Sequence, residues 1–309
     1  MTILLAAAFD ADEAAQWQAC LEAALPGERW VRHREEADDI DIAVVANPPP
    51  GSLDGLSGLR LIQSLWAGVD KLLRDPTVPA GVPLARMVDP TMNTAMAETA
   101  LWAVLHLHRD HDLYTVQQRE RSWRQHPQRR ADEVHVAVLG LGEMGRTTAL
   151  RLVANGYRVS GWSRRGAEVP GVMVAQGPEG LRRVLGEADI VVNLLPLTPD
   201  TQGLFNATTL AGMRPGASLV NLARGGHVVE ADLLAALDAG PLRHAVLDVF
   251  RDEPLAPDHP FWAHRRVTVR PHVAAATDPR SAAQVVARNL RALREGRPLA
   301  HLVDRSAGY

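Results

Sequence analysis

Lysine and cysteine are almost absent from this chain of 309 residues, in which Lys71 and Cys20 are the single examples. One cysteine excludes an intrachain disulfide and any zinc or iron–sulfur site built from cysteines. His106, His108 and His111 do not share one helix face, so we expect no metal site there either.

The sequence also lacks a strong charge imbalance and a long apolar run. Lys+Arg is 33 and Asp+Glu is 36, giving a net charge of −3 with no long basic tract, so we expect neither a nucleic acid nor a membrane surface as partner. No apolar stretch approaches the roughly 20 residues of a membrane span. The apolar segment 2–9 has no basic residues before it and runs into Asp10, which favours a buried strand over a signal peptide. We therefore expect a cytoplasmic protein.

Apolar runs of strand length alternate with helical patterns along the whole chain. We expect strands at 3–8, 42–46, 59–65, 84–88, 136–139, 157–162, 189–194, 217–222, 244–249 and 267–270, and helices that include 12–25, 143–155, 230–239 and 280–295. The stretch from about Met92 to Trp123, free of Pro and Gly, is expected as one long helix buried on two sides. This alternation predicts an α/β fold with parallel sheets, and the length predicts two domains.

A glycine-rich segment follows the strand expected at 136–139. Gly140, Gly142 and Gly145 match the pattern G-x-G-x-x-G between a strand and a helix, with Glu143 and Met144 opening the helix. That context is typical of a dinucleotide-binding loop, in which backbone N–H groups at a helix start hold a pyrophosphate. A glycine-rich turn without a ligand is the alternative interpretation.

The end of the next strand reads Trp162-Ser163-Arg164-Arg165. An NAD site places a carboxylate near this point to accept the ribose 2′-hydroxyl, and none is present. A serine and two arginines suit a 2′-phosphate instead, which predicts NADP(H) as the preferred cofactor with NAD(H) as the alternative. A solvated basic loop would give the same sequence.

Three further polar residues follow expected strands, namely Arg224, Glu253 and His272. The carboxyl ends of parallel strands meet at one edge of a sheet, so these side chains should converge beside the cofactor. An arginine fork can bind an anionic substrate, a histidine can exchange a proton, and a carboxylate can orient the imidazole. A strand-end arginine taken alone is more often part of a surface ion pair.

Four motifs carry a resemblance: Gly140-Leu-Gly142-Glu-Met-Gly145, Asn221-Leu-Ala-Arg224-Gly, Leu247-Asp248-Val-Phe250 with Glu253-Pro254-Leu255, and Pro271-His272-Val-Ala-Ala275. In these the chain resembles the D-isomer-specific 2-hydroxyacid dehydrogenase family. Trp162-Ser163-Arg164 and the ending Val303-Asp304-Arg305 with Gly308-Tyr309 resemble its glyoxylate/hydroxypyruvate reductase A branch. The resemblance covers nearly the whole chain and is most specific in the C-terminal half.

The resemblance implies two doubly wound parallel-sheet domains, with a Rossmann NAD(P)-binding domain at 99–277 inserted into a flavodoxin-like substrate-binding domain made of 1–98 and 278–309. It implies that Arg224 binds substrate, that His272 is the general acid/base and that Glu253 is its partner. The residues implied to line the nicotinamide side of the cofactor are Leu195, Pro196, Leu222, Ala223 and Asp248. Arg224 and His272 are also expected to bind the cofactor. The backbone N–H groups of Ala67, Gly68 and Val69 would hold the substrate carboxylate, and the long helix after Met92 would form a homodimer interface.

Three residues depart from the pattern of this branch, namely Ala46, Trp66 and Arg270. Trp66 stands beside the substrate turn where relatives carry a small residue, so it is either a wall of the substrate pocket or part of the core. The predicted function is NADPH-dependent reduction of small 2-oxoacids such as glyoxylate or hydroxypyruvate to D-2-hydroxyacids. A dinucleotide-sensing binding protein on the same fold and an NAD-dependent dehydrogenase of a bulkier 2-hydroxyacid remain as alternatives.

Overall fold

The computed structural model describes all 309 residues, which divide into two compact units. Unit 1 comprises residues 1–92 and 277–309, and unit 2 comprises residues 93–276. Unit 2 is therefore one continuous segment inserted into unit 1. The first junction expected from the sequence, after residue 98, lies inside helix α3 (Pro90–His108), whereas the units divide near the start of that helix.

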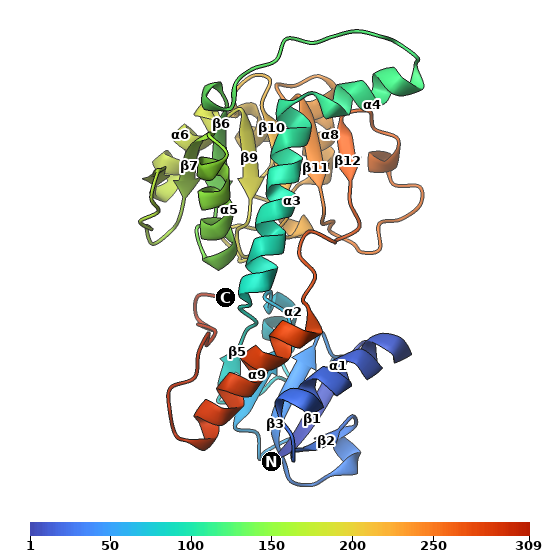
Figure 1. Ribbon diagram of the computed structural model, residues 1–309, viewed down its shortest axis with the longest axis vertical. Coiled ribbons are helices and arrows are strands. Elements are labelled where there is room, and N and C mark those ends of the chain that lie inside the picture. Colours follow the sequence, from blue (N-terminus) through green and yellow to red (C-terminus); the bar gives the residue numbers. More distant parts are fainter. The chain divides into compact units, whose positions relative to one another are not determined.

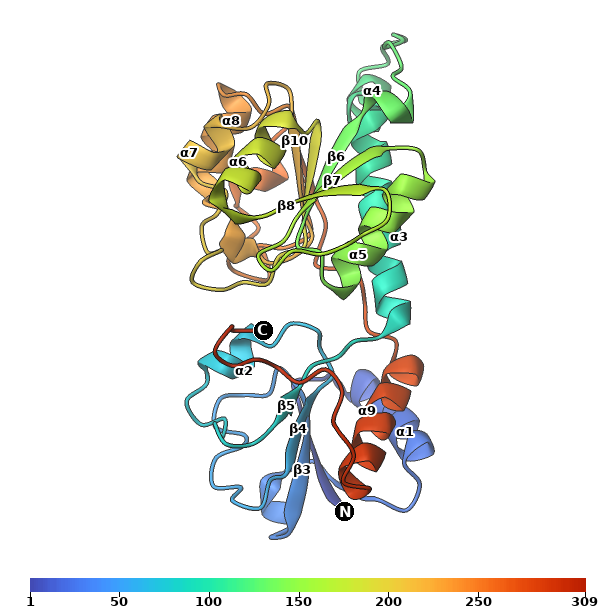
Figure 2. The ribbon, with the colours of Figure 1, turned by 90° about the vertical axis from the view of Figure 1, so that its left-hand side faces the viewer.

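Unit 1 is built on a parallel sheet with the strand order β2-β1-β3-β4-β5. The strands are β1 (Thr2–Ala7), β2 (Arg29–Val31), β3 (Ile40–Ala46), β4 (Leu61–Ser64) and β5 (Leu84–Ala85). Helices α1 (Ala11–Ala24) and α9 (Pro279–Arg294) pack together on one face, and α2 (Asp70–Arg74) lies on the other (Figure 2). This is the strand order of flavodoxin-like sheets.

Unit 2 holds a seven-stranded parallel sheet in the order β12-β11-β10-β9-β6-β7-β8. The strands are β6 (His135–Leu139), β7 (Arg158–Trp162), β8 (Val172–Ala175), β9 (Ile190–Asn193), β10 (Ser218–Asn221), β11 (His244–Leu247) and β12 (Val267–Val269). Helices α3 and α5 (Glu143–Ala154) cover one face, and α6 (Gly177–Glu187), α7 (Ala207–Ala211) and α8 (Glu230–Asp238) cover the other (Figures 1 and 2). The order is that of a Rossmann sheet, which confirms the predicted fold class.

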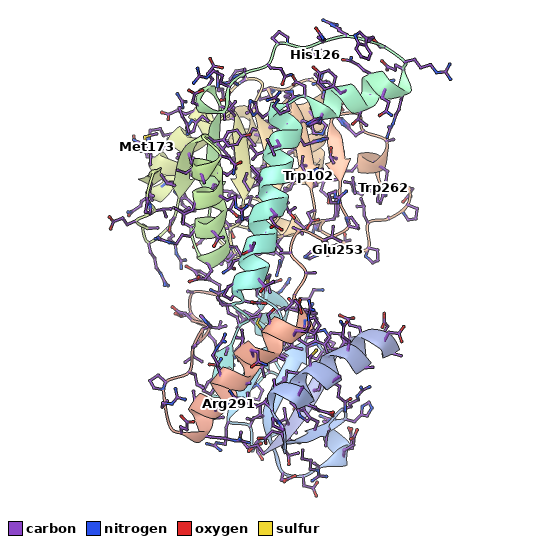
Figure 3. All side chains as sticks on the ribbon, in the orientation of Figure 1. Trp102, His126, Met173, Glu253, Trp262 and Arg291 are labelled. Carbon is purple, nitrogen blue, oxygen red and sulfur yellow. The ribbon has the colours of Figure 1, made fainter.

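The chain returns to unit 1 through α9, whose apolar face packs on α1 and the sheet. Two polar contacts fix the helix there. Asn289 Nδ2 donates to Oε1 of the buried Gln63 at 2.7 Å. Arg291, labelled on α9 in Figure 3, donates to the carbonyl oxygen of Ala24 at 3.0 Å. Buried polar groups need such partners, so these bonds make α9 an integral part of unit 1.

The prediction of one helix from about Met92 to Trp123 is wrong. The chain leaves the helical path after α3 because Asp110 adopts a left-handed backbone with φ of 56°, and a separate helix α4 (His111–Arg119) follows. Arg243 binds both Asp110 and Asp112 at 2.8–2.9 Å. It is distant from them in the sequence and approaches them only in the folded chain. Trp123 lies beyond α4 and is 96% exposed rather than buried. None of the helices has the length and apolar content needed to cross a membrane.

Candidate active site

The glycine-rich loop joins β6 to α5 in unit 2. Gly140 has φ of 90°, and a Cβ there would lie 2.7 Å from the carbonyl oxygen of Leu194, so only glycine fits this turn. A Cβ on Gly145 would overlap the carbonyl oxygen of Gly140, which explains the close approach of helix and strand. A Cβ on Gly142, in contrast, would meet no atom of the chain within 4 Å. The loop is therefore tightly packed on one side and open on the other.

The open side of this loop has the donors that a dinucleotide pyrophosphate needs. The backbone N–H groups of Glu143 and Met144 open helix α5 and have no acceptor within the chain. The first N–H groups of a helix and its positive dipole end attract anions. Together with the space beside Gly142, these donors fit the pyrophosphate of an NAD(P) cofactor.

The segment after β7 carries the residues predicted to choose between the two cofactors. Trp162 is fixed by its Nε1–H, which donates to the carbonyl oxygen of Gly177 at 2.9 Å. Ser163 follows it, and the side chains of Arg164 and Arg165 are exposed. Arg164 Nη1 lies 3.9 Å from a carboxylate oxygen of Asp200, a separation typical of an exposed surface pair. This arrangement fits a 2′-phosphate.

His272 and Glu253 form a direct pair at the carboxyl edge of the same sheet. His272 Nδ1 lies 2.8 Å from Oε2 of Glu253, and the other carboxylate oxygen accepts the backbone N–H of Phe250 at 2.9 Å. Burial raises the pKa of Glu253, but its hydrogen bonds to His272 and Phe250 and the charges of His272 and Arg224 outweigh this, so the pKa is lowered overall. Glu253 is therefore ionised at neutral pH, and His272 keeps Nε2 for a substrate.

Asp248 fixes the backbone that carries His272. Its side chain is fully buried, and its two oxygens accept the N–H groups of Val273 and Ala274, each at 2.9 Å. Its carbonyl oxygen accepts the N–H of His272 at 2.8 Å, and His272 itself has φ of 55°. The resemblance implies that Asp248 lines the nicotinamide side of the cofactor, which stays a prediction; within the chain, the side chain of Asp248 contacts the turn after β12.

Arg224 reaches the site because the loop after β10 lies directly on the loop after β11. A Cβ on Gly225 would overlap the backbone carbonyl of Phe250, so only glycine permits this approach. Arg224 is half-buried, and one guanidinium nitrogen donates to the carbonyl oxygen of Ala223 at 2.7 Å. The structure thus brings the loops of Arg224, Glu253 and His272 to one edge of unit 2, as the strand ends predict.

Buried side-chain amides that the sequence did not predict support these loops. Asn193 Nδ2, at the end of β9, donates to Oδ1 of Asn221, at the end of β10, at 2.9 Å. Asn221 Nδ2 in turn donates to the carbonyl oxygen of Arg224 at 2.9 Å, and His227 Nδ1 lies 3.0 Å from the same oxygen. The sequence did contain a signal for these amides, because an asparagine stands at the end of each of two apolar strands.

The residues predicted to bind the substrate carboxylate lie in unit 1, where they form the turn between β4 and α2. The backbone N–H groups of Ala67, Gly68 and Val69 have no hydrogen-bond acceptor within the chain. Trp66, directly before them, is half-buried, with its ring edge against Phe9 and Trp17. Three consecutive N–H groups without an acceptor can bind a carboxylate.

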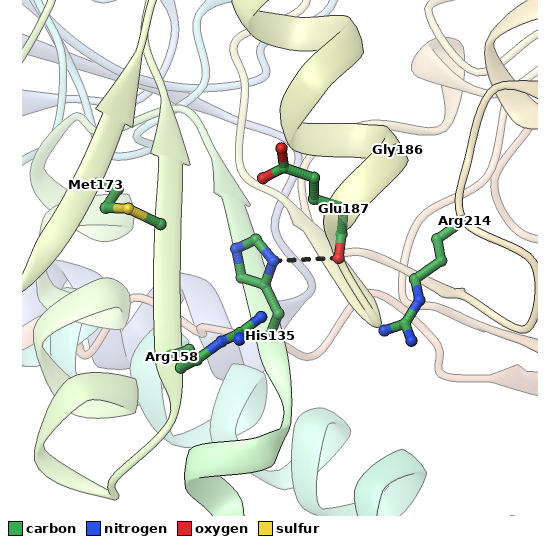
Figure 4. A pocket seen from close by; sticks show the side chains of 6 residues that line it. All are labelled: His135, Arg158, Met173, Gly186, Glu187 and Arg214. Atoms are coloured by element: carbon green, nitrogen blue, oxygen red, sulfur yellow. Dashed lines mark hydrogen bonds between the residues drawn. The ribbon is translucent and has the colours of Figure 1, made fainter.

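An open pocket of about 530 Å³ lies elsewhere, beside the amino ends of β6 and β7 and away from the glycine-rich loop (Figure 4). Its wall includes the buried His135, whose Nδ1 lies 3.1 Å from the carbonyl oxygen of Glu187 and whose Nε2 lies 2.9 Å from Ser160 Oγ. Burial lowers the pKa of His135. This histidine is therefore a neutral structural group, and the pocket is separate from the site.

A Rossmann sheet with this glycine-rich loop and a histidine–carboxylate pair at its carboxyl edge defines the class of NAD(P)-dependent oxidoreductases. Residues 101–274 match the model of the D-isomer specific 2-hydroxyacid dehydrogenase, NAD binding domain. The chain belongs to the D-isomer specific 2-hydroxyacid dehydrogenase family. The resemblance inferred from the motifs is thereby confirmed.

Individual relatives match over the whole length. The chain is 41% identical over 308 residues to the glyoxylate/hydroxypyruvate reductase A of Serratia proteamaculans, covering 97% of each chain. It is 39% identical, with a TM-score of 0.95, to a D-isomer specific 2-hydroxyacid dehydrogenase from Xanthobacter autotrophicus Py2 solved with NADPH and MES, covering 100% and 99% of the two chains. An NADPH-dependent glyoxylate/hydroxypyruvate reductase from Sinorhizobium meliloti, solved with NADP and sulfate, is 37% identical with a TM-score of 0.93 and the same coverage.

Proposed function

We propose that this protein reduces small 2-oxoacids of the glyoxylate and hydroxypyruvate kind to D-2-hydroxyacids with NADPH. The observation that carries the proposal is the contact of His272 Nδ1 with an ionised Glu253, which leaves Nε2 to protonate a substrate oxygen. Relatives that are similar to this chain along nearly its whole length are named glyoxylate/hydroxypyruvate reductases, and these names support the choice of substrate.

The proposed roles follow from the chemistry of each group. The nicotinamide, when bound, supplies the hydride. In unit 1, the N–H groups of Ala67, Gly68 and Val69 bind the substrate carboxylate. In unit 2, the guanidinium of Arg224 binds an anionic substrate, and His272 gives its proton to the oxygen that was the ketone or aldehyde. Glu253 keeps the imidazole oriented and stabilises its protonated form. Unit 1 thus acts as the substrate-binding domain and unit 2 as the cofactor-binding domain.

We also propose that the protein is a homodimer. Four large apolar side chains on and just after helices α3 and α4 are at least one-third exposed, namely Trp102, Leu105, Leu113 and Trp123. Exposed apolar patches of this kind mark interaction surfaces. A second copy of the same chain would cover them.

The test of the function is an assay of NADPH and NADH oxidation with glyoxylate, hydroxypyruvate and bulkier 2-oxoacids. We expect turnover of the small 2-oxoacids with NADPH, and a loss of about 10²–10⁴-fold in kcat in His272→Gln with the binding of NADPH retained. His259→Gln, which alters a histidine paired with Glu230, is the matched control. Binding of NADPH without turnover of any 2-oxoacid would favour a dinucleotide-sensing protein.

A further inference from the structure

Three aromatic rings gather at the carboxyl edge of the sheet of unit 1. Phe9 follows β1 and stacks on Trp17 of α1, with centroids 5.8 Å apart and planes within 2°. Trp66, which follows β4, stands edge-on to both, with centroids 6.1 Å from Phe9 and 5.9 Å from Trp17. Trp17 is 1% exposed, so the two half-buried rings rest on a fixed base. Stacked and edge-on pairs are favourable ring geometries.

The backbone of Trp66 is held as firmly as its ring. The Oγ of Ser64 accepts the N–H of Trp66 at 3.0 Å and donates its own hydrogen to the carbonyl oxygen of Trp66, also at 3.0 Å. The N–H of Met87 donates to the same carbonyl oxygen at 3.1 Å. Ser64 is 1% exposed, and its hydroxyl therefore holds both the N–H and the carbonyl group of Trp66 at the start of the turn.

The N–H groups that follow have the opposite character. Those of Ala67, Gly68 and Val69 come directly after the fixed Trp66 and donate to nothing within the chain. The dihedral angles at Trp66, which the Ser64 hydroxyl and the three rings restrict, set the direction of the Ala67 N–H and the starting point from which the Gly68 and Val69 N–H groups follow. The turn thus combines a rigid start with three donors oriented for a ligand.

We propose that Ser64 is a positioning residue for substrate binding: its hydroxyl, with the ring cluster of Phe9, Trp17 and Trp66, fixes the N–H groups of Ala67, Gly68 and Val69 in the geometry that receives the substrate carboxylate. The inference rests on the proposed function, because it assumes that a 2-oxoacid carboxylate binds this turn. It adds two residues, Ser64 and Phe9, that do not touch the substrate themselves.

The experiment compares Ser64→Ala with Ser64→Thr, which keeps a hydroxyl. Loss of two hydrogen bonds of about 0.5–1 kcal/mol each predicts a rise in KM for glyoxylate of roughly 5- to 30-fold in Ser64→Ala. The KM for NADPH should stay unchanged and kcat should change far less than KM, because His272 and Glu253 are untouched. The inhibition constant of oxamate, a non-reacting 2-oxoacid analogue, should rise in parallel, and Ser64→Thr should restore most of the binding.

Ser160→Ala is the matched control, because it also removes a buried hydroxyl hydrogen bond, at 2.9 Å to His135. Its KM for glyoxylate should equal that of the parent. Phe9→Leu keeps Ser64 but loosens the ring cluster, and it should raise KM by a smaller factor even if Ser64→Ala fails to fold. The inference would be overturned if the parent reduces glyoxylate and either Phe9→Leu or a folded Ser64→Ala variant keeps the parental KM for glyoxylate. A parent that reduces no 2-oxoacid would instead overturn the proposed function.

Discussion

At the scale of the residue, the chemistry depends on how each side chain at the strand ends is held. One carboxylate oxygen of Glu253 accepts the N–H of Phe250, and the other contacts Nδ1 of His272. The imidazole of His272 therefore has one orientation in which Nδ1 stays in contact with Glu253. The sequence predicts this pair because each residue follows an expected strand. It does not predict Gly225 as a contact residue or Ser64 as a positioning residue, because their roles depend on neighbours that only the fold supplies.

The carboxylate of Glu253 should set the pH at which reduction fails. Its lowered pKa keeps it ionised through the neutral range, where it stabilises protonated His272, the form that gives a proton in reduction. In Glu253→Gln that charge is gone at every pH, so kcat/KM should fall at neutral pH, and the decline of the parental profile on acidification through the lowered pKa of Glu253 should be absent. The measurement is kcat/KM for glyoxylate against pH.

Glu230→Gln is the control for this experiment, since Glu230 also contacts a histidine, His259, at 3.3 Å but away from the strand-end set. Its pH profile should match that of the parent. If Glu253→Gln had the parental profile as well, Glu253 would have no influence on the proton donor.

At the scale of the element, the strands with continuous apolar runs are the ones that the sequence predicts. Buried parallel strands need apolar side chains on both faces, and β6 and β9 are buried throughout. The edge strand β2 was missed because its three residues form no apolar run. Strand β8 was missed although its four residues are apolar, because so short a run between glycine and glutamine is weak evidence of a strand. The break between α3 and α4 was missed because Arg243, which binds Asp110 and Asp112, comes from the start of β11.

The segment after β7 should determine the choice of cofactor. A charge-assisted hydrogen bond to a phosphate contributes roughly 1.5–3 kcal/mol, so one or two such bonds predict an NADPH preference of about 10- to 10³-fold in kcat/KM. Arg164→Ala and Arg165→Ala should each reduce this preference by about tenfold or more, through a higher KM for NADPH. The KM for NADH should change little, since NADH has no 2′-phosphate.

Arg183→Ala, an exposed arginine of helix α6, is the control for non-specific loss of positive charge and should keep the parental ratio. A parent that prefers NADH would contradict the cofactor assignment. A parent that prefers NADPH with both variants unaffected would show that other groups bind the phosphate.

At the scale of the whole molecule, each unit has its own parallel sheet and its own set of ligand-directed N–H groups. Unit 1 offers those of the Ala67–Val69 turn, and unit 2 offers those at the start of α5. The sequence predicts the N–H groups at the start of α5 from the glycine motif, because Gly140 permits the turn, Gly145 the close approach of helix and strand, and Gly142 the open space beside the loop. The turn of unit 1 has no comparable motif, and its assignment came from the resemblance alone.

The surface of unit 2 leads to the last prediction, that the protein is a dimer through α3 and α4. Trp102, labelled on α3 in Figure 3, and Leu105 lie one turn apart on one face of this helix. Each is 38% exposed, and Leu113 of α4 is 37% exposed. We expect two copies per particle at micromolar concentration in sedimentation velocity. Leu105→Glu would bury an unpaired charge in that interface and should weaken dimerisation by about 10²-fold or more. Met173→Glu, at an apolar residue of β8 that is 67% exposed, should leave the dimer intact. A parent that sediments as a monomer, or equal weakening by both variants, would contradict this interface.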